Sequence, residues 1–373
     1  MMPHLTAIGL MSGTSYDGVD VALVDNDGET IARLGPTGYR PYSEQERDVI
    51  ARAIAAAGKI ERRDERPRAL ALAEELVTDI HAEAVEAFLA ANSMTPREVA
   101  VVGFHGQTVL HRPEQGVSIQ LGNGSALAKR LGIPVIYDFR AADLAAGGQG
   151  APIVAVFHRA LVRMLERPLP IAVLNLGGVA NLTFIDADDV LIAFDTGPGN
   201  ALLDDFLRLR TNQPHDDGGR VAAAGRVDEA LVTRVLAHPF FAQKPPKSLD
   251  RNAFRQWVIK QVRLAEKTTQ DGAATLTAIT AAAIARAVAV LPRAPMSWIV
   301  AGGGTRNPTL MGMLSKRLAP AAVETANAVG WSADALEAQA FAYLAVRALK
   351  GLPITFPGTT GVARPLPGGV LVR

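Results

Sequence analysis

The stretch that decides the fold is Leu5-Thr-Ala-Ile-Gly-Leu-Met-Ser-Gly-Thr-Ser-Tyr-Asp-Gly-Val-Asp-Val-Ala-Leu-Val-Asp25. Two strand-like apolar runs, residues 5–11 and 19–25, flank a polar turn that contains two glycines, residues 12–18. Asn26-Asp-Gly28 is a hairpin signal, and another strand-like run begins at Glu29. The sequence therefore predicts a three-stranded meander whose first turn carries hydroxyls, glycines and a carboxylate.

A second segment has the same design about half a chain later. It comprises a strand at 170–175, a glycine turn at 176–181, a strand at 182–185, a polar turn at 186–189 and a strand at 190–195. Strand order and turn position agree with the first segment, although two hairpins can also resemble each other by chance. The repeat predicts an α/β protein of two related lobes around one cleft.

Composition limits the function classes. The chain has 373 residues, 49% of them hydrophobic, which is enough for two domains with large cores. Lys and Arg total 38 against 37 Asp and Glu, and this near-balance argues against a broad nucleic-acid surface. There is no Cys, which excludes disulfides, cysteine-bound metal centres and thiol catalysis and fits a reducing cytoplasm. No signal peptide is recognised at the N-terminus, and the apolar stretch 273–291 is interpreted as a buried helix, not a membrane span.

The segments around the two meanders alternate between helical and strand patterns. Gly302-Gly-Gly304 follows one predicted strand, and Asp334 is expected to cap the last helix. The last twenty residues are rich in Pro and Gly and are expected to be irregular. The predicted helices are at 68–91, 153–165 and 334–347, and the further strands are at 99–104, 134–137 and 297–301.

The first turn has the composition of a phosphate-binding loop. Its backbone N–H groups can form an anion nest, and its glycines permit close approach of a phosphate. Asp17 or Asp20 could hold Mg²⁺ through water. An ordinary hairpin is the alternative, but the repeat supplies a second glycine turn, Gly177-Gly178, and two such turns can grip a triphosphate together.

Gly302-Gly303-Gly304 lies between a predicted strand and a predicted helix. Three glycines there permit flat packing against an adenine or a ribose, whereas a plain turn needs only one. Neither the Walker A pattern nor the Rossmann glycine fingerprint occurs in the chain.

Asp195-Thr-Gly-Pro-Gly-Asn200 closes the second meander. A carboxylate at the C-terminal end of a core strand suits a general base on a rigid element. The alternative is a cap for the helix predicted over 201–209, but Asn200 is expected to serve there, so we predict a catalytic role for Asp195. The stretches 105–108 and 120–124 are interpreted as polar loops facing a substrate, with His105 either a general acid or a residue bonded to a neighbouring strand.

The motifs together resemble the anhydro-N-acetylmuramic acid kinase family, nearly end to end and in the family's order. The family belongs to the superfamily of sugar kinases, actin and heat-shock chaperones, so the resemblance implies a two-lobed actin-like ATPase fold. The motifs are Gly9-Leu-Met-Ser-Gly-Thr-Ser-Tyr-Asp-Gly-Val-Asp20, His105-Gly-Gln-Thr108, Asp138-Phe-Arg-Ala-Ala-Asp-Leu-Ala-Ala-Gly-Gly-Gln-Gly-Ala-Pro152, Asn175-Leu-Gly-Gly-Val-Ala-Asn181, Phe194-Asp-Thr-Gly-Pro-Gly-Asn200 and Gly302-Gly-Gly304.

The resemblance implies an ATP- and Mg²⁺-dependent kinase of cell-wall recycling. The enzyme would open the anhydro ring of 1,6-anhydro-N-acetylmuramic acid with water, phosphorylate O6, and use Asp195 as the base that activates the water. The implied ATP-site residues are Ser12, Gly13, Thr14, Ser15, Tyr16, Asp17, Gly18, Val19, Asp20, Gly177, Gly178, Gly302, Gly303 and Asn307, and the implied sugar or water contacts are Thr108, Gln120 and Glu337.

The expected organisation is an N-terminal lobe over 1–165, completed by part of 345–373, and a C-terminal lobe over 166–344. The family suggests a cytoplasmic homodimer acting on a small amino sugar, with no nucleic-acid or membrane partner. Two residues depart from the expected pattern, Phe104 and Asn123, and both concern substrate fit. A kinase of the same fold for another sugar, and an actin- or chaperone-like nucleotide-binding protein, remain as alternatives.

Overall fold

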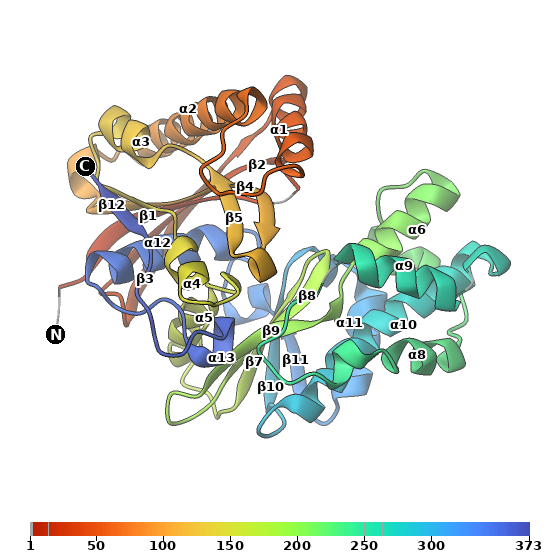
Figure 1. The fold of residues 1–373 in the computed structure, drawn as a ribbon. Helices are drawn as coiled ribbons and strands as arrows, with labels where there is room; N and C mark the ends of the chain where they lie inside the picture. Colours follow the sequence, from red (N-terminus) through yellow and green to blue (C-terminus); the bar gives the residue numbers. More distant parts are fainter. Residues whose placement is uncertain (1–2, 14, 250, 263) are drawn as a thin grey trace. The chain divides into compact units, whose positions relative to one another are not determined.

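The structure is a computed structural model that describes residues 3–13, 15–249, 251–262 and 264–373. The chain divides into two compact units, which Figure 1 shows in the colours of the sequence. Unit 1 comprises the residues up to Met164 together with Ala335–Arg373, and unit 2 comprises Leu165–Asp334. Each unit is built on one mixed β-sheet, called sheet A in unit 1 and sheet B in unit 2.

Sheet A begins with the predicted meander. Strand β1 pairs antiparallel with β2, and β2 pairs antiparallel with β3. On the other side of β1, strands β4 and β6 follow in parallel, and β12 closes this edge. The bounds are β1 Leu5–Ser12, β2 Gly18–Asn26, β3 Ile31–Pro41, β4 Val101–Arg112, β5 Val117–Leu121, β6 Val135–Tyr137 and β12 Val370–Val372.

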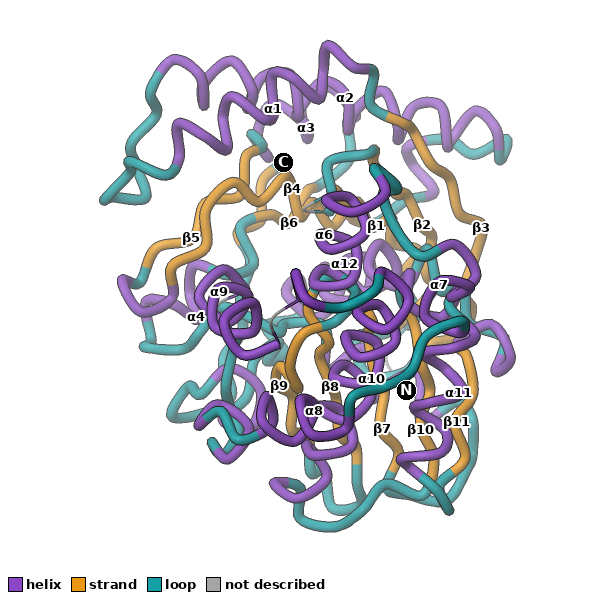
Figure 2. Tube along the Cα trace, turned by 90° about the vertical axis from the view of Figure 1, so that its right-hand side faces the viewer, coloured by secondary structure: helices purple, strands orange, loops and turns teal. Residues whose placement is uncertain are grey.

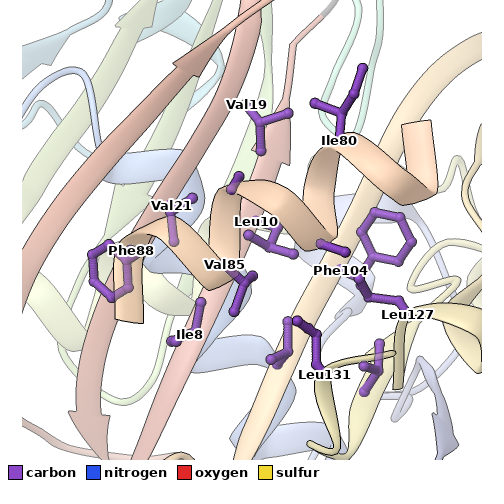
Figure 3. Packing of buried hydrophobic residues seen from close by; sticks show 14 of the residues in the cluster. Ile8, Leu10, Val19, Val21, Ile80, Val85, Phe88, Phe104, Leu127 and Leu131 are labelled. Atoms are coloured by element: carbon purple, nitrogen blue, oxygen red, sulfur yellow. The ribbon is translucent and has the colours of Figure 1, made fainter. Parts of the chain in front are cut away.

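One face of sheet A is covered by α1 (Glu44–Ala57), α2 (Arg68–Ala91) and α3 (Gly124–Leu131). Strand periodicity places alternate side chains such as Ile8 and Leu10 on this face, where they pack against the apolar stripe of α2 (Figure 3). Each large side chain buried in this way stabilises the fold by roughly 1.5–3 kcal/mol before entropy is counted. The predicted helix over 68–91 is confirmed.

The opposite face is covered by α12, Leu336–Leu349. A Cβ on Gly9 would lie 1.8 Å from the carbonyl oxygen of Ala338, and one on Gly103 would lie 2.1 Å from that of Phe341. The helix therefore packs directly on the strand backbone. The predicted boundary after residue 344 divides this helix, whereas the structure places the whole helix in unit 1. The N-cap is Ala335, so the cap expected at Asp334 is wrong; Asp334 pairs with Arg306 instead.

Two further predictions for unit 1 are corrected by pairing that is distant in sequence. Residues 105–108, expected in a loop, lie within β4, and Gln120 lies within β5, because these two strands form a hairpin. The tail expected to be irregular contributes α13 and the edge strand β12. The remaining elements are α4 Ala141–Ala145, α5 Ala155–Arg163, α13 Pro357–Thr360 and the 3₁₀ turns η1 Pro96–Glu98 and η2 Pro113–Gln115.

Sheet B has the order β11-β10-β7-β8-β9, in which β7, β8 and β9 form the second predicted meander. Strand β10 runs parallel to β7, and β11 runs parallel to β10. The bounds are β7 Ile171–Leu176, β8 Val179–Ile185, β9 Leu191–Pro198, β10 Ser297–Ala301 and β11 Ala322–Thr325.

Helix α10, Thr269–Ala287, is the central helix of unit 2 and lies beside sheet B with α11 (Figure 2). Its extension Thr269–Val290 is long and apolar enough to cross a membrane by length and composition alone, but 72% of its most apolar window is buried inside the structure. The predicted buried helix is confirmed. The other helices are α6 Ala201–Thr211, α7 Arg220–Ala223, α8 Glu229–Leu236, α9 Arg251–Val262 and α11 Pro308–Leu318, and the 3₁₀ turns are η3 Asp217–Gly219, η4 Pro239–Ala242, η5 Leu264–Glu266, η6 Val288–Val290, η7 Gly303–Arg306 and η8 Ala326–Val329.

The two sheets share one topology. In each, three antiparallel strands are followed by two strands that continue in parallel from the first strand of the meander. This repeated order is that of duplicated ribonuclease-H-like lobes, so the predicted actin-like ATPase fold class is confirmed.

Candidate active site

The turn after β1 in unit 1 is held by a buried side-chain network. The hydroxyl of Ser12 donates to Gln107 Oε1 over 2.5 Å, and Tyr42 Oη lies 3.0 Å from the same hydroxyl. The amide of Gln107 donates to the carbonyl of Gly13 over 3.0 Å. A side chain from β4 thus bonds both the last residue of β1 and the first residue of the turn, and it fixes how the turn leaves the sheet.

The rest of the turn presents hydroxyl and carboxylate groups. Tyr16 has a φ of 41°, and its N–H donates to the carbonyl of Gly13, which closes the turn. The Ser15 hydroxyl donates to Asp17 Oδ1 over 2.9 Å. A Cβ on Gly18 would overlap the ring of Tyr39.

Thr14, Val19 and Asp20 are among the predicted ATP-site residues in and beside this turn. Thr14 lies outside the described residues. The side chain of Val19 is fully buried in the core, so only its backbone remains available to a ligand. Asp20 has contacts of its own within the structure. The ligand contacts predicted for the whole stretch stay predictions.

His105 is a buried neutral histidine. Its Nδ1 lies 2.8 Å from the carbonyl oxygen of Gly106 and its Nε2 lies 3.0 Å from Arg140 Nη2. Since the carbonyl only accepts and the guanidinium only donates, Nδ1 carries the proton and Nε2 accepts. Burial and the charge of Arg140 hold the pKa of His105 well below its usual value. Of the two roles left open, the geometry supports a residue bonded to its neighbours, not a general acid.

Thr108 and Gln120 are brought together by the β4–β5 hairpin. They are directly paired in the register, and Gln120 Nε2 donates to Thr108 Oγ1 over 3.2 Å and to Ser118 Oγ over 2.8 Å. Gln120 also lines a pocket of about 430 Å³ in unit 1, together with Asn123, His105 and the ion pair formed by Arg63 and Asp138. The hairpin therefore supplies neighbouring hydrogen-bonding groups of the kind that recognise sugar hydroxyls.

Glu337 lies in the first turn of α12. Burial lowers the pKa of Arg140 to about 10, and the carboxylates of Glu337 and Asp143 oppose that change. Glu337 is thus electrostatically coupled to the arginine that holds His105, and its predicted contact with sugar or water stays a prediction.

In the corresponding turn of unit 2, the two glycine carbonyls are held by backbone donors. Gly199 N donates to the carbonyl of Gly178 over 3.0 Å, and Asn200 N donates to that of Gly177 over 2.8 Å. A Cβ on Gly199 would lie 2.2 Å from Gly177 O, so this contact requires glycine. Asn200 is the N-cap residue of α6, as expected, but its side chain donates to Leu176 O and makes no capping hydrogen bond.

The three glycines after β10 sit against the end of β7. Gly302 has a φ of 84°, and a Cβ there would lie 2.4 Å from Asn175 Oδ1. Nothing lies within 4 Å of the space that a Cβ on Gly303 would occupy. Asn307 is the N-cap of α11, accepting from Leu310 N over 2.9 Å. Parallel pairing of β7 with β10 thus places Gly177, Gly178 and the 302–307 turn at one edge of sheet B.

Asp195 lies near the end of β9, and one of its carboxylate oxygens is tied to the chain. Oδ2 accepts from Leu249 N over 2.8 Å, and Asp195 N donates to Lys247 O over 3.0 Å. Burial raises the pKa of Asp195 to about 6, against the lowering effects of the Leu249 N–H and the Lys247 ammonium. A carboxylate of this kind is ionised at neutral pH and is a stronger base than an exposed aspartate.

Comparison with known proteins identifies the family. The sequence profile described as "Anhydro-N-acetylmuramic acid kinase" matches residues 5–372. The chain belongs to the anhydro-N-acetylmuramic acid kinase family. Proteins named anhydro-N-acetylmuramic acid kinase are 58% identical in Rhodopseudomonas palustris strain BisB18 and 57% identical in Nitrobacter winogradskyi, each alignment covering 99% of this chain and 100% of the relative. A solved component of (R)-2-hydroxyglutaryl-CoA dehydratase from Acidaminococcus fermentans aligns over 92% of this chain and 98% of that one, with a TM-score of 0.47 and 11% identity.

Membership of the anhydro-N-acetylmuramic acid kinase family establishes the general activity. The chain is a kinase that acts on a small amino sugar, with ATP as the phosphoryl donor.

The β1–β2 turn has groups that fit a magnesium ion. Partial burial is the largest cause that raises the pKa of Tyr39, and the charges of Asp17 and Asp20 raise it further. Both carboxylates therefore act on the same side chain. Carboxylate oxygens are ligands that Mg²⁺ prefers, with water and phosphate completing the shell. Within the described ranges, no group of three or more His, Asp or Glu side chains is placed to hold a metal without such help.

Lys247, whose charge acts on Asp195, was not among the residues predicted from the sequence. It follows Pro245-Pro246 in a segment without a regular pattern, and no spacing links it to Asp195, 52 positions earlier. Its only local signal is a lysine soon after the aromatic pair Phe240-Phe241.

Proposed function

We propose that this kinase converts 1,6-anhydro-N-acetylmuramic acid, ATP and water into N-acetylmuramic acid 6-phosphate and ADP, in the recycling of peptidoglycan. The observation that carries this proposal is the Asp195 carboxylate, which is half-buried near the end of a core strand, oriented by Leu249 N–H and shifted to a pKa of about 6. Family membership supports the substrate class, and the carboxylate supports the water-dependent step.

In the first step, Asp195 takes a proton from a water molecule that attacks C1 of the sugar. The C1–O6 bond breaks, the water oxygen stays on C1, and O6 becomes the nucleophile. A pKa near 6 leaves the carboxylate mostly ionised at pH 7 and still able to accept a proton, as general base catalysis requires. The bond to Leu249 N–H limits rotation of the carboxylate, which favours one direction of proton transfer.

In the second step, O6 attacks the γ-phosphorus of ATP and the bond to the β-phosphate oxygen breaks. Such transfers depend on positioning and charge stabilisation more than on covalent chemistry. The turns at Gly13–Gly18 and Gly177-Gly178 would present backbone to the phosphates, and Gly302, Gly303 and Asn307 would contact the adenosine. Bound through Asp17 or Asp20, Mg²⁺ would neutralise developing phosphate charge.

Sugar recognition is assigned to the β4–β5 hairpin of unit 1. Thr108 and Gln120 are hydrogen-bonded neighbours there, and Gln120 lines the pocket of about 430 Å³. Glu337 is assigned to the sugar or the water through its coupling to Arg140.

We propose that the protein is a homodimer in the cytoplasm. Light scattering after gel filtration tests the dimer, and localisation of a tagged chain tests the compartment.

The reaction is tested in ¹⁸O water with ATP, Mg²⁺ and 1,6-anhydro-N-acetylmuramic acid. Mass spectrometry should find the label at C1 and phosphate at O6. Glucose and N-acetylglucosamine, which have no anhydro bridge, are the control substrates. Turnover of a control sugar in place of the anhydro sugar would move the proposal to another sugar kinase of the same fold.

Replacing the base should cause a large loss of activity. Asp195→Asn keeps the shape and can still accept from Leu249 N–H, but it removes the proton acceptor, so kcat should fall roughly 10²-fold or more. The matched control is Asp186→Asn, because Asp186 lies on the polar turn between β8 and β9 and bonds Arg293 at the surface. Wild-type kcat in the Asp195→Asn enzyme would remove the base role and leave the kinase assignment intact.

A further inference from the structure

The segment 247–249 forms hydrogen bonds with Asp195 at two points. Asp195 N donates to Lys247 O over 3.0 Å, and two residues further on Leu249 N donates to Asp195 Oδ2 over 2.8 Å. The same short segment therefore pairs with the backbone of β9 and orients the carboxylate. Whatever holds this segment in place also determines the direction in which the carboxylate points.

The side chain of Lys247 is the anchor of this segment. Lys247 is only 6% exposed, and its Nζ donates to Phe240 O over 2.9 Å. The ammonium also lies over two aromatic rings, 4.5 Å from the centroid of Phe240 and 5.5 Å from that of Phe194. Cation–π contacts of a desolvated ammonium help to offset the cost of burying the charge. Lys247 thus links η4 to the residue immediately before Asp195.

We infer that Lys247 is a positioning residue for the kinase reaction: its buried ammonium fixes residues 247–249 against β9 and gives the Asp195 carboxylate its orientation and its positive neighbour. This inference rests on the proposed role of Asp195. Lys247 acts through Asp195 and through the segment that carries Leu249, without a contact to substrate being required.

Charges around the pair support this role. Burial lowers the pKa of Lys247 to about 8, against the opposing effect of Asp195, so the ammonium is charged at neutral pH. The Leu249 N–H and then this charge lower the pKa that burial alone would give Asp195, and together they keep the carboxylate ionised near pH 7. Without the ammonium, the acid form of Asp195 would persist to higher pH.

The other elements around Asp195 present few competing charges. Opposite it on β8 stands Asn181, which is uncharged. Helix α10 meets the end of β9 with Ala283, and Arg286 of that helix is exposed. On the η4 side, His238 accepts from Phe240 N and packs edge-on against Trp257. Among the residues that the structure describes, Lys247 is the charged side chain whose field acts on this carboxylate.

The test compares the titration of Asp195 in wild type, Lys247→Met and Lys247→Arg. Carboxyl ¹³C NMR of aspartate-labelled enzyme, assigned with Asp195→Asn, reads the midpoint without activity. Met fills the space between the two rings without charge, so the midpoint should rise by about one pH unit, and Arg should restore it. The acid limb of kcat/KM, expected near pH 6 in wild type, should move up by the same amount.

Lys244→Met is the matched control, because Lys244 lies three residues earlier in the same segment and is exposed. It should leave the Asp195 midpoint and the pH profile unchanged. An unchanged midpoint in a folded Lys247→Met enzyme would overturn the inference. Near-UV circular dichroism reports folding, and Lys247→Gln is the second neutral variant. If both neutral variants unfold and only Lys247→Arg folds, Lys247 is a structural anchor and the inference fails.

The experiments distinguish an error in the proposed base role of Asp195 from an error in the proposed positioning role of Lys247. An active Asp195→Asn enzyme would show that Asp195 is not the general base. NMR of the wild type and the Lys247 variants would still report whether Lys247 acts on the carboxylate. An inactive Asp195→Asn enzyme with an unmoved midpoint in Lys247→Met would keep the base and remove only the role of Lys247.

Discussion

Sheets A and B share one strand order but hold their first turns in different ways. In sheet A, Gln107 reaches from β4 to Ser12 and Gly13, so side chains shape the turn. In sheet B, the carbonyls of Gly177 and Gly178 accept from the backbone that follows β9. A turn held by side chains can be altered by single substitutions, whereas one held by backbone depends on glycine and on main-chain geometry.

The sheets differ also at one matched pair of positions. Gly9 and Gly103 are partners on β1 and β4, and the pair in the same place on β7 and β10 is Val173 and Ile299. The glycines let α12 touch the backbone of sheet A, which side chains at these positions would prevent. Duplication preserved the strand order, while the packing on each sheet came to depend on different residues.

The largest expected effect tests the glycine contact. Gly9→Ala places a methyl group 1.8 Å from the carbonyl oxygen of Ala338, and the helix backbone cannot move away without losing its contact with Gly103. Unit 1 should lose roughly 3 kcal/mol or more of its free energy of unfolding. Urea denaturation, with hydrogen exchange to separate the units, measures this loss.

Val173→Ala in sheet B is the matched variant for Gly9→Ala. It removes buried carbon from a position in the same register, and it should cost roughly 2 kcal/mol. A smaller loss for Gly9→Ala than for Val173→Ala would show that α12 tolerates a side chain beneath it, and the distinction between the two sheets would fail.

Acid should weaken unit 1 through a buried histidine. His81 on α2 is buried beside the ring of Phe104, and burial lowers its pKa to about 4. The unfolded chain binds a proton below about pH 6.5, but the folded chain does not. Its contribution to stability is therefore complete above pH 6.5 and is lost as the pH falls toward 4, by roughly 2 kcal/mol at pH 5.

Hydrogen exchange of the sheet A strands at pH 7 and pH 5 measures this effect. His81→Leu removes the titrating group, so the difference in stability between the two pH values should shrink by about 2 kcal/mol relative to wild type. An equal difference in both proteins would show that His81 does not couple folding to pH.

The smallest expected effect tests the side-chain turn. Gln107→Leu removes the acceptor of the Ser12 hydroxyl, which keeps Tyr42 as a partner, and the side-chain donor to Gly13 O, so it should cost roughly 1–2 kcal/mol and raise KM for ATP about fivefold with less change in kcat. Asn200→Ala is the matched variant in sheet B, since only the bond from its side chain to Leu176 O is lost. If Asn200→Ala raises KM for ATP as much as Gln107→Leu does, the two turns are not held differently.

The sequence by itself determined the elements whose signals are local. The two meanders and the helix Arg68–Ala91 follow from apolar periodicity and glycine turns, because side-chain direction repeats every two or 3.6 residues. The repeated order of those signals also predicted the fold class, and the motifs predicted the family. Asp195 could be proposed as the base because a carboxylate at a strand end is a local pattern.

Only the tertiary structure decided what depends on distant partners. The β4–β5 hairpin and the edge strand β12 exist because separate segments meet. The side chain of Asn200 donates to Leu176 O on a distant strand and makes no capping hydrogen bond. Burial, the Leu249 N–H and the Lys247 ammonium set the ionisation of Asp195. No local pattern ties these residues to that carboxylate, because they follow it by more than 50 positions. Local periodicity specifies which elements form, but pKa values and hydrogen-bond partners depend on which distant atoms exclude water around a group.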